Sequence, residues 1–532
     1  MTQSLLIGLT IVASLSPLLT FAHLFQLKEW RLDRLREHLR ETGWLQLTGT
    51  VRPVALSILI LLFQIPSLRN SQFLNFQFVA LGALTLLNVA QILLKKQPYP
   101  VWTQKAITLV MGSLILTAIA SYWLSVIGYW FPIVFIPLLQ FLVLTIALIL
   151  LSPLDYFLKQ HIHARACTLR AQFPDLTVIG ITGSAGKTTT KELLAHILGP
   201  EHALATPEHV NSELGVAQWL ITNLQPTTYN LQPVLIVEMG AYRAGEIATL
   251  CTITQPTIGI ITSIGTQHIG LFGSQKAIAK AKGELFEALP PHGQAFTGEG
   301  PFTQYLQTLC RCPMTVVSPF PLHISLSPVP LPAGRQALPA AAGEGGNGIS
   351  FHFLEREWHV PLHGTHNATN AALAIAVARY IGTHDEAIAE RLRTFRPSAH
   401  TFSIREERGI QILDDTHNAS PESFRAAIVW AKNQQHPHKV LLSPGIIEQG
   451  SNIQTIHREL GSLAKDVFAD AFILNKKLAQ YFEQGFVEPV RSLPPTPYPL
   501  PHPIGPPNTS TTNSRTSTPQ QHSPSVAPVR GF

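Results

Sequence analysis

The stretch from Thr182 to Thr190, TGSAGKTTT, combines glycines, one lysine and a row of hydroxyls in a spacing that suits phosphate binding. It follows an apolar run typical of a strand, at 176–181, and leads into a run typical of a helix, from Lys191. At such a turn, backbone N–H groups and the helix dipole face an anion, a lysine neutralises it and a hydroxyl can reach Mg²⁺. A tight turn without a ligand is the alternative, but the strand context and the threonines favour a nucleoside triphosphate site. The residues expected to bind it are Gly183, Ser184, Ala185, Gly186, Lys187, Thr188 and Thr189.

Two further polar residues are expected to lie beside this loop. The runs VLIVEMG at 234–240 and TIGIITSIG at 257–265 are short, apolar and end in a polar residue and a glycine. In a parallel α/β sheet the carboxyl ends of the strands converge on the ligand crevice, which would place Glu238 and His268 there. A carboxylate near Mg²⁺-bound phosphates is a natural metal ligand. For His268, taken alone, a merely structural role is equally open.

The predicted nucleotide site lies in an unusually apolar chain. Only 13% of the 532 residues are charged, and the mean hydropathy is +0.18. No Asp, Glu, Lys or Arg occurs at 1–27, 71–94 or 106–154, and the last window is long enough for two spans of about 20 residues. With a shorter apolar run at 53–68, the sequence predicts a membrane domain over residues 1–154 with about five transmembrane helices. A buried helical core and a cleaved signal peptide are the less favoured alternatives.

The basic residues between these windows predict an orientation. They gather in the 28–52 loop, around 95–105 and after 155. The positive-inside rule then gives a multi-pass protein of the cytoplasmic membrane, with the N-terminus outside and everything after residue 155 in the cytoplasm. Charges at helical spacing in 28–41 indicate a solvated or interfacial helix. No aromatic–basic patch suggests nucleic acid, and the four cysteines lack the spacing of a metal or disulfide site.

Seven motifs in order along the chain resemble the Mur ligase family. The resemblance covers about residues 176–480 and is strongest to the type of ligase that adds D-alanyl-D-alanine. The motifs are TGSAGKTTTKELL at 182–194, NSELGV at 211–216, VEMGAYRAGEI at 237–247, SIGTQHIGLFGS at 263–274, AKGELF at 281–286, HGTHNATNAALA at 363–374 and LDDTHNASPES at 413–423.

The resemblance implies an α/β fold and a reaction. After the membrane domain and a linker at 155–175 would come a central ATP-binding domain with a parallel sheet, at 176–383. A smaller, Rossmann-like C-terminal domain, shorter than in the family, would follow at 384–486. The family uses ATP and Mg²⁺ in peptidoglycan precursor synthesis. It phosphorylates a muramyl-peptide carboxylate, and an amine such as D-Ala-D-Ala then attacks the acyl phosphate.

By the same resemblance, three residues carry the catalytic roles. Lys187 would contact the β- and γ-phosphates, Thr188 and Glu238 would hold one Mg²⁺, and His268 would bind a second. Lys282 matches a lysine that several family members carbamylate, which turns a cation into a carboxylate-like metal ligand. The alternative for Lys282 is a lysine on the surface of a helix. The catalytic residues expected are therefore Lys187, His268 and Lys282.

The remaining motif residues are expected to contact the nucleotide or the substrate. Asn367 and Asn370 match residues on the adenine side, although unaided they read as a helix cap. Asp415, at the end of a predicted strand, is the best candidate for reaching ribose and phosphates. The residues expected near the reacting substrate are Asn211 and Glu213, whose alternative is a helix cap with an acidic first turn, together with His417 and Asn418.

Several segments depart from the family pattern. His400 and Thr401 stand where the family has a pair ending in arginine, and 444–450 stands where a Gly-Asp-Met run is usual. Residues 318–348 read as a loop insertion, and 487–532, with 12 prolines, as a disordered tail. Only about 20 residues separate the last predicted span from the first ligase strand, too few for the domain that holds the UDP-sugar in the family.

These departures leave three function classes open. The first is a ligase of the D-alanyl-D-alanine-adding type, whose acceptor is either a soluble UDP-linked muramyl peptide or a lipid-linked form held at the membrane. The second is another amide ligase with the same centre, adding glutamate or ammonia. The third is a non-catalytic membrane scaffold that binds ATP. Membrane lipid is an expected partner in each case.

Overall fold

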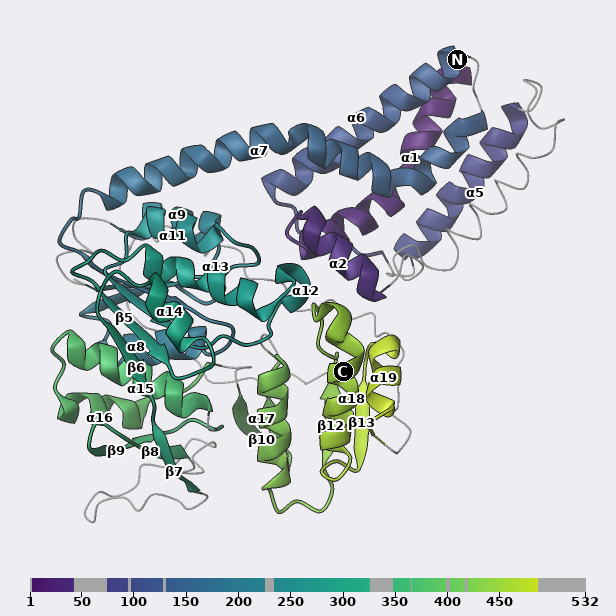
Figure 1. The fold of residues 1–532 in the computed structure, drawn as a ribbon. Coiled ribbons are helices and arrows are strands. Elements are labelled where there is room, and N and C mark those ends of the chain that lie inside the picture. The colour runs from purple at the N-terminus through teal and green to yellow at the C-terminus, as the bar shows by residue number, and fades with distance from the viewer. Residues whose placement is uncertain are drawn as a thin grey trace, which may run out of the picture. The chain divides into compact units, whose positions relative to one another are not determined.

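The computed structural model describes residues 2–42, 74–93, 97–127, 131–224, 234–325, 348–364, 366–398, 402–416 and 420–486. The predicted span at 53–68 and the predicted disordered tail at 487–532 lie outside these ranges, as do His400, Thr401, His417 and Asn418. Figure 1 shows the chain from the N-terminal helices to the last described helix, α19 (Lys476–Glu483).

The N-terminal region is helical. Among the described residues, three stretches are long and apolar enough to cross a membrane: Gln3–Leu27, Gln104–Val126 and Phe135–Arg170. A fourth apolar helix, α5, occupies one of the predicted spans. The elements are α1 (Thr2–Leu27), α2 (Leu32–Thr42), α5 (Leu74–Leu93), α6 (Gln104–Val126), the 3-10 helix η3 (Phe131–Leu139) and α7 (Gln140–Arg170).

The long helices of this region bury apolar side chains and also expose them. Phe21 and Leu144 are buried where α1, α6 and α7 pack together. On the outside, Trp123 of α6 and Leu150 and Phe157 of α7 are each at least 60% exposed. These exposed apolar side chains lie on the helices that are long and apolar enough to cross a membrane.

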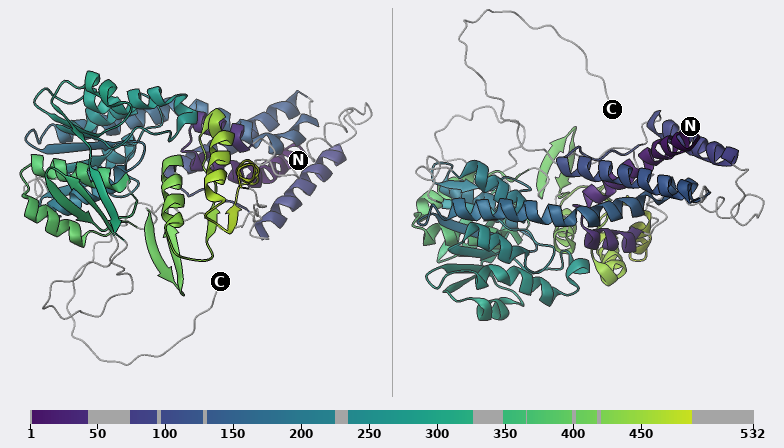
Figure 2. Two further views of the ribbon diagram at one scale, coloured as in Figure 1. Left: turned by 60° about the horizontal axis from the view of Figure 1, so that its bottom comes forward. Right: turned by 90° about the horizontal axis from the view of Figure 1, so that it is seen from above.

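The expected linker at 155–175 is mostly helix. Figure 2 shows α7 as one unbroken helix, which continues to Arg170 because 154–170 holds neither glycine nor proline. Its end is anchored by Arg170, which is 2% exposed and donates to the carbonyl oxygens of Thr254, at 2.9 Å, and Leu176, at 3.2 Å. The apolar region and the first central strand are thus joined by a packed helix rather than by a loose segment.

The centre of the fold is a parallel sheet, as the sequence predicts. In the described residues it has six strands in the order β2-β3-β1-β4-β5-β6, and β1 lies between β3 and β4 in parallel register. The strands are β1 (Thr177–Thr182), β2 (Ala203–Ala205), β3 (Val234–Glu238), β4 (Ile258–Ile261), β5 (Gln294–Gly298) and β6 (Met314–Val317).

Helices cover both faces of this sheet, because successive residues of a strand point to opposite faces. Val178 packs with α7, α9, α11 and α13, whereas its neighbour Ile179 packs with α8, α15 and α16. The helices are α8 (Lys187–Leu198), α9 (Glu213–Asn223), α11 (Glu246–Thr254), α12 (Ile269–Phe272), α13 (Gln275–Glu287), α14 (Thr303–Leu309), α15 (His366–Tyr380) and α16 (Asp385–Thr394).

Two predicted boundaries move. Ile388 and Leu392 of α16 are fully buried in the same core as α8 and α15, so the central domain extends beyond residue 383. The insertion expected at 318–348 begins with a strand, since β7 (Phe320–Ser325) pairs antiparallel with β8 (Gly348–Phe353), which pairs with β9 (Arg356–Val360). The sequence pattern predicts individual helices and strands, but it does not predict in which hydrophobic core or sheet each of them packs.

The C-terminal region is small. In the described residues a parallel β12–β13 pair and three helices surround a core that includes Leu460, Ile473 and Phe482, and an antiparallel β10–β11 pair precedes them. The elements are β10 (Ser403–Glu407), β11 (Ile410–Asp414), α17 (Pro421–Lys432), β12 (Val440–Ser443), the 3-10 helix η4 (Gly450–Asn452), α18 (Ile453–Ala464), β13 (Asp470–Ile473) and α19 (Lys476–Glu483).

Candidate active site

The predicted phosphate loop has the shape that phosphate binding needs. It turns from β1 into α8 through Gly183, with a φ of 154°, and Gly186, with a φ of 82°. A Cβ at Gly183 would collide with the Thr262 hydroxyl, and one at Gly186 would collide with the Asn370 amide. Both positions therefore require glycine, for the backbone angle and for the close approach of β4 and α15.

The loop is tied to the chain that follows β4. Ser263 accepts the Ala185 N–H on its hydroxyl at 3.1 Å and the Ser184 N–H on its carbonyl at 2.8 Å. The Ser184 hydroxyl in turn accepts the Gly265 N–H at 2.9 Å. These contacts hold the loop open in one conformation, which lowers the cost of ordering it around an anion.

Two lysines converge on the loop, one half-buried (Lys187) and one buried (Lys282). Lys187 Nζ and Lys282 Nζ each donate to the Gly183 carbonyl at 2.9 Å. Lys282 is 2% exposed, so it is not a lysine on the surface of a helix. Burial lowers the pKa of Lys187, with the charge of Glu238 opposing the shift. Burial and the neighbouring Lys187 charge lower the pKa of Lys282 further, which favours its neutral amine.

Glu238 lies at the end of β3 and is shared among several donors. Its Oε2 lies 3.1 Å from both the Thr188 hydroxyl and Lys191 Nζ, and its Oε1 accepts from the Asn211 amide at 3.0 Å. Burial alone would raise the pKa of Glu238, but the charges of Lys191 and Lys187 lower it, so the carboxylate stays ionised. The sequence reasoning missed Lys191, although its position one helical turn after Lys187 could have indicated it.

These groups fit a magnesium ion that also binds phosphate. No cluster of three or more His, Cys, Asp and Glu occurs within the described ranges, so the protein alone does not build a metal cage there. Mg²⁺ usually binds through one or two protein oxygens, several waters and the substrate phosphates. The adjacent Thr188 hydroxyl and Glu238 carboxylate supply that number of oxygens.

His268 is held by two groups from outside its own segment. Its Nδ1 lies 2.5 Å from Glu448 Oε2, and its ring meets the Tyr242 ring edge-on at 4.7 Å between centroids. Burial lowers the pKa of His268, and the hydrogen bond from His268, with nearby positive charge, lowers that of Glu448 to about 2 against the effect of burial. An ionised carboxylate can only accept a hydrogen bond, so the proton of the neutral His268 ring lies on Nδ1. The lone pair of Nε2 is then left for a ligand.

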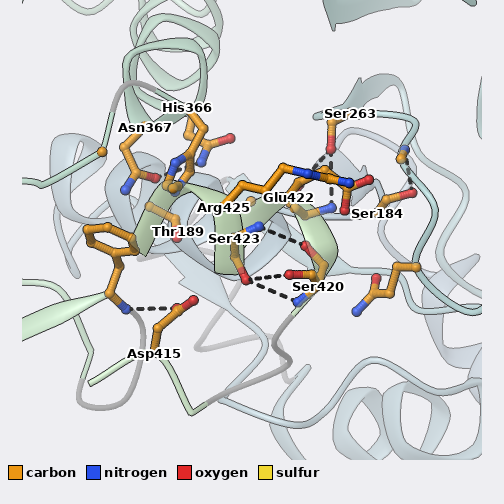
Figure 3. A pocket seen from close by; sticks show the side chains of 18 of the residues that line it. Ser184, Thr189, Ser263, His366, Asn367, Asp415, Ser420, Glu422, Ser423 and Arg425 are labelled. Carbon is orange, nitrogen blue, oxygen red and sulfur yellow. Dashed lines mark hydrogen bonds between the residues drawn. The ribbon is translucent and has the colours of Figure 1, made fainter. Parts of the chain in front are cut away.

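A cavity of about 900 Å³ opens beside the loop. Figure 3 shows side chains from the loop, from α15 and from α17 around it. Asn370 donates to the Asn367 side chain at 2.8 Å, and Asp415 Oδ1 accepts the Phe402 N–H at 3.1 Å. Burial raises the pKa of Asp415 to about 6. The asparagines and the aspartate assigned to the nucleotide thus line the cavity together with the loop.

The first turns of α17 close the cavity on its far side, which the sequence reasoning missed. Glu422 Oε1 accepts from the Thr266 hydroxyl at 2.9 Å, and Arg425 donates to both carboxylate oxygens of Glu459 at 3.0 Å. Trp430, one turn further, also lines the cavity. Glu422 lies within the quoted motif at 413–423, so its presence, but not its role, could be read from the sequence.

The predicted substrate residues separate. Asn211 lies against Glu238, as described above. Glu213 begins α9 after the capping residue Ser212 and shares a hydrogen bond with Thr249 instead. Glu213 thus lies in the acidic first turn of a capped helix, and its expected place near the reacting substrate stays a prediction. His417 and Asn418 lie outside the described residues.

Comparisons with known proteins agree with this geometry. Residues 181–378 match the sequence model of the Mur ligase middle domain. The chain is 33% identical over 301 residues to the UDP-N-acetylmuramoyl-tripeptide–D-alanyl-D-alanine ligase of Mycobacterium tuberculosis, covering 54% of this chain and 56% of that one. For the ligase of the same name from Bacillus subtilis, identity is 28% over 312 residues, covering 58% and 64%.

A solved structure extends the match to the fold. The crystal structure of MurF from Acinetobacter baumannii superposes with a TM-score of 0.54 and 27% identity, over 63% of this chain and 71% of that one. The chain spans about half the length of the mycobacterial relative. The family match and the loop geometry together identify residues 181–378 as a Mur ligase middle domain.

Proposed function

We propose that this chain is an ATP-dependent amide ligase of peptidoglycan precursor synthesis. It would activate a muramyl-peptide carboxylate and join it to an amine such as D-Ala-D-Ala. The observation that carries the proposal is the arrangement of Lys187, Glu238 and Lys282 around one phosphate loop, beside a cavity of about 900 Å³. The names of the relatives from Mycobacterium tuberculosis and Bacillus subtilis support the choice of substrates.

The chemistry needs positioning and positive charge more than it needs an acid or a base. A carboxylate is a poor electrophile, so the γ-phosphoryl group of ATP must move onto it through a highly charged transition state. The backbone N–H groups of the loop and Lys187 would hold the phosphates, and Asn367, Asn370 and Asp415 the nucleoside end of the cavity. One Mg²⁺ ion, held by Thr188 and Glu238, and a second, held by His268, would neutralise the phosphate oxygens.

The amine completes the reaction. It attacks the carbonyl carbon of the acyl phosphate, the tetrahedral intermediate collapses, and phosphate leaves while the amide bond remains. The lone pair of the amine forms the new bond, and the amine proton leaves to solvent. In this scheme Asn211 acts through Glu238, since its amide holds the second carboxylate oxygen at 3.0 Å.

Lys282 would act as a carbamate. Its buried amine has a lowered pKa, and a neutral amine can attack CO₂, with loss of one proton, to give an anionic carbamate. That anion would turn a group that repels Mg²⁺ into a ligand. A ¹³C resonance of a carbamate after growth or exchange in ¹³C-bicarbonate, lost in Lys282→Arg, is the expected signature; its absence from the active wild-type protein would contradict this role.

The apolar helices would place the enzyme in the cytoplasmic membrane. The three helices long enough to span it, with exposed side chains such as Trp123 and Leu150, support a multi-pass segment with the catalytic domains on the cytoplasmic side. Retention in the membrane fraction after carbonate washing, with residue 2 accessible only from the outer face, is the expected result. Release by carbonate would refute it.

Acceptor-dependent phosphate release from the detergent-solubilised full chain tests the function. With ATP, Mg²⁺, muramyl tripeptide and D-Ala-D-Ala, the wild type is expected to release phosphate and form the amide, whereas Lys187→Ala should not. Lys276→Ala, at an exposed lysine of α13, is the matched control and should keep the wild-type rate. No acceptor-dependent release from the wild type, or release that survives Lys187→Ala, would contradict the proposal.

Two parallel assays settle the acceptor and the amine. UDP-linked and lipid-linked muramyl tripeptides are compared as acceptors, and stimulation by the soluble form alone would exclude a lipid-linked acceptor. D-Ala-D-Ala, D-glutamate and ammonia are compared as amines at fixed acceptor. Turnover with D-glutamate or ammonia but not with the dipeptide would assign a different ligase to the same site.

A further inference from the structure

Three segments far apart in the sequence meet at His268. They are the start of α2 after the first apolar helix, the loop around α12 in the central domain, and residues 446–450 in the C-terminal region. The backbone links the last two, because the Gly270 N–H donates to the Glu448 carbonyl at 2.9 Å. The helix α2 lies next to α12 (Figure 1), and a Cβ added at Gly270 would meet Glu37 of α2 at 2.7 Å and Gly450 N at 2.9 Å.

Arg34 of α2 touches both groups that hold His268. Its guanidinium carbon lies 4.2 Å from the centroid of the Tyr242 ring, over the ring face, and its NH2 lies 3.4 Å from Glu448 Oε1. Tyr242 packs on the imidazole of His268, and Glu448 accepts a hydrogen bond from the Nδ1–H of that imidazole. One side chain from the segment after the first apolar helix therefore supports the histidine from two directions.

Arg31 fixes this end of α2 on the central domain. It pairs with Glu246 at 2.6 Å and with Asp33 at 2.7 Å, and it also approaches the Tyr242 ring at 5.4 Å. Glu246 in turn accepts the Tyr242 N–H at 2.7 Å. The side chains of Glu246 and Glu448 are 9% and 6% exposed, so these contacts are sheltered from water. Sheltered pairs are less screened by salt than surface pairs.

We propose that Arg34 is a positioning residue for the ligase reaction, which holds Tyr242 and Glu448 and through them fixes the His268 imidazole. The inference rests on the proposed function, since it assigns His268 to the reacting centre. It gives α2 a role beyond that of a solvated or interfacial helix. In this proposal, residues from α2, from the central domain and from the C-terminal region together hold His268 in place.

The kinetic test separates positioning from folding. Arg34→Gln keeps length and polarity but removes the charge, and Arg34→Lys restores it. Arg36→Gln, at an exposed arginine two residues further along α2, is the matched control. Arg34→Gln is expected to lower kcat by at least about 10-fold and to raise the Mg²⁺ concentration for half-maximal rate by a similar factor. The KM for ATP should not change, because the cavity that would hold the nucleotide does not include Tyr242 or Glu448.

A purely structural role predicts a different pattern. A smaller folded fraction of the variant would lower the apparent kcat without changing the Mg²⁺ concentration for half-maximal rate. In that case Arg34→Lys would give no partial rescue. Either result would overturn the proposal, as would wild-type kinetics in Arg34→Gln. An inactive wild type would instead defeat the proposed function, so the two failures remain distinguishable.

Hydrogen exchange of the full chain in detergent gives a readout without turnover. Arg34→Gln is expected to speed exchange at the Gly270 amide, and at 446–450, by at least about 10-fold. The α8 amides should keep their wild-type rates, since α8 lies in another part of the central core. Unchanged protection at Gly270, or uniform loss of protection over the central domain, would contradict a local positioning role.

Discussion

The buried pair between Glu238 and Lys191 allows a quantitative test of the electrostatics beneath the phosphate loop. Their side chains are 4% and 3% exposed and 3.1 Å apart. Removing one partner of such a pair typically costs 3–5 kcal/mol, because the other is left as an uncompensated buried charge.

The double variant is expected to lose less stability than the two single changes added together. Lys191→Met keeps the length of the side chain and removes the charge that Glu238→Gln leaves behind. We expect Glu238→Gln alone to lose about 3–4 kcal/mol, and the pair of changes to lose less than the sum of the single changes by about 2 kcal/mol. In a domain of about 200 residues each kcal/mol corresponds to roughly 2–4 °C in melting temperature.

Thermal unfolding of the four proteins in detergent, without nucleotide, measures this coupling. Glu238→Gln should melt at least about 6 °C below the wild type, and the double variant should melt at least about 4 °C above the temperature expected from adding the two single shifts. Lys276→Met, at an exposed lysine, is the control and should lie within about 0.5 kcal/mol of the wild type. Additivity of the two single changes would refute the reasoning, because it would mean that the pair does not interact.

Three further predictions follow from the same site. Lys187→Ala should lower ATP-dependent phosphate release by at least about 100-fold, measured with a phosphate sensor, because a cation aimed at the transferred phosphoryl group is lost. Gly186→Ala should weaken nucleotide binding by at least about 10-fold in calorimetry, since its φ of 82° costs a side chain roughly 1–2 kcal/mol and the new Cβ meets Asn370, whereas Gly300→Ala, with open space around it, should bind normally. Native Asp415 keeps its proton up to a pKa of about 6, above that of an unfolded aspartate, so stability should fall by about 2–3 kcal/mol as the pH rises from about 4 to 6, and Asp415→Asn should abolish that fall in pH-dependent melting. An equal fall in the variant would contradict the assignment.

The parts of the site that the sequence predicts are those carried by neighbouring residues. The glycines of the loop, the strand before it and the helix after it lie within 176–198, and each has a local signal. Glu238 ends its own strand, and the α15 asparagines lie in the first turns of their own helix. A strand of alternating apolar residues or a glycine forced to positive φ needs no knowledge of distant segments.

The parts that escaped prediction depend on pairs of distant residues. Glu448 and His268 are 180 residues apart, and Arg34 and Glu448 are 414 apart. No spacing rule connects such positions, since only the fold brings them together. The sequence did not predict that α16 belongs to the central core, for the same reason. The apolar face of this helix indicates that it is buried but not against which elements it packs. The linker at 155–175 was predicted without a secondary structure, and the structure makes most of it the end of α7, which lacks glycine and proline after residue 154.

The two attachments of the apolar region to the central domain differ in kind, and this difference determines which can respond to the chemistry. The end of α7 is joined through packed apolar side chains and the buried Arg170, on the sheet face opposite α8. Close-packed contacts of that sort have one arrangement and resist displacement. The start of α2 is joined through ion pairs and a ring face at Tyr242, and its partner Glu448 comes from a third segment. Contacts of this kind depend on a few charged side chains, so a substitution at Arg34 is expected to disturb the surroundings of His268 while the packed end of α7 stays in place.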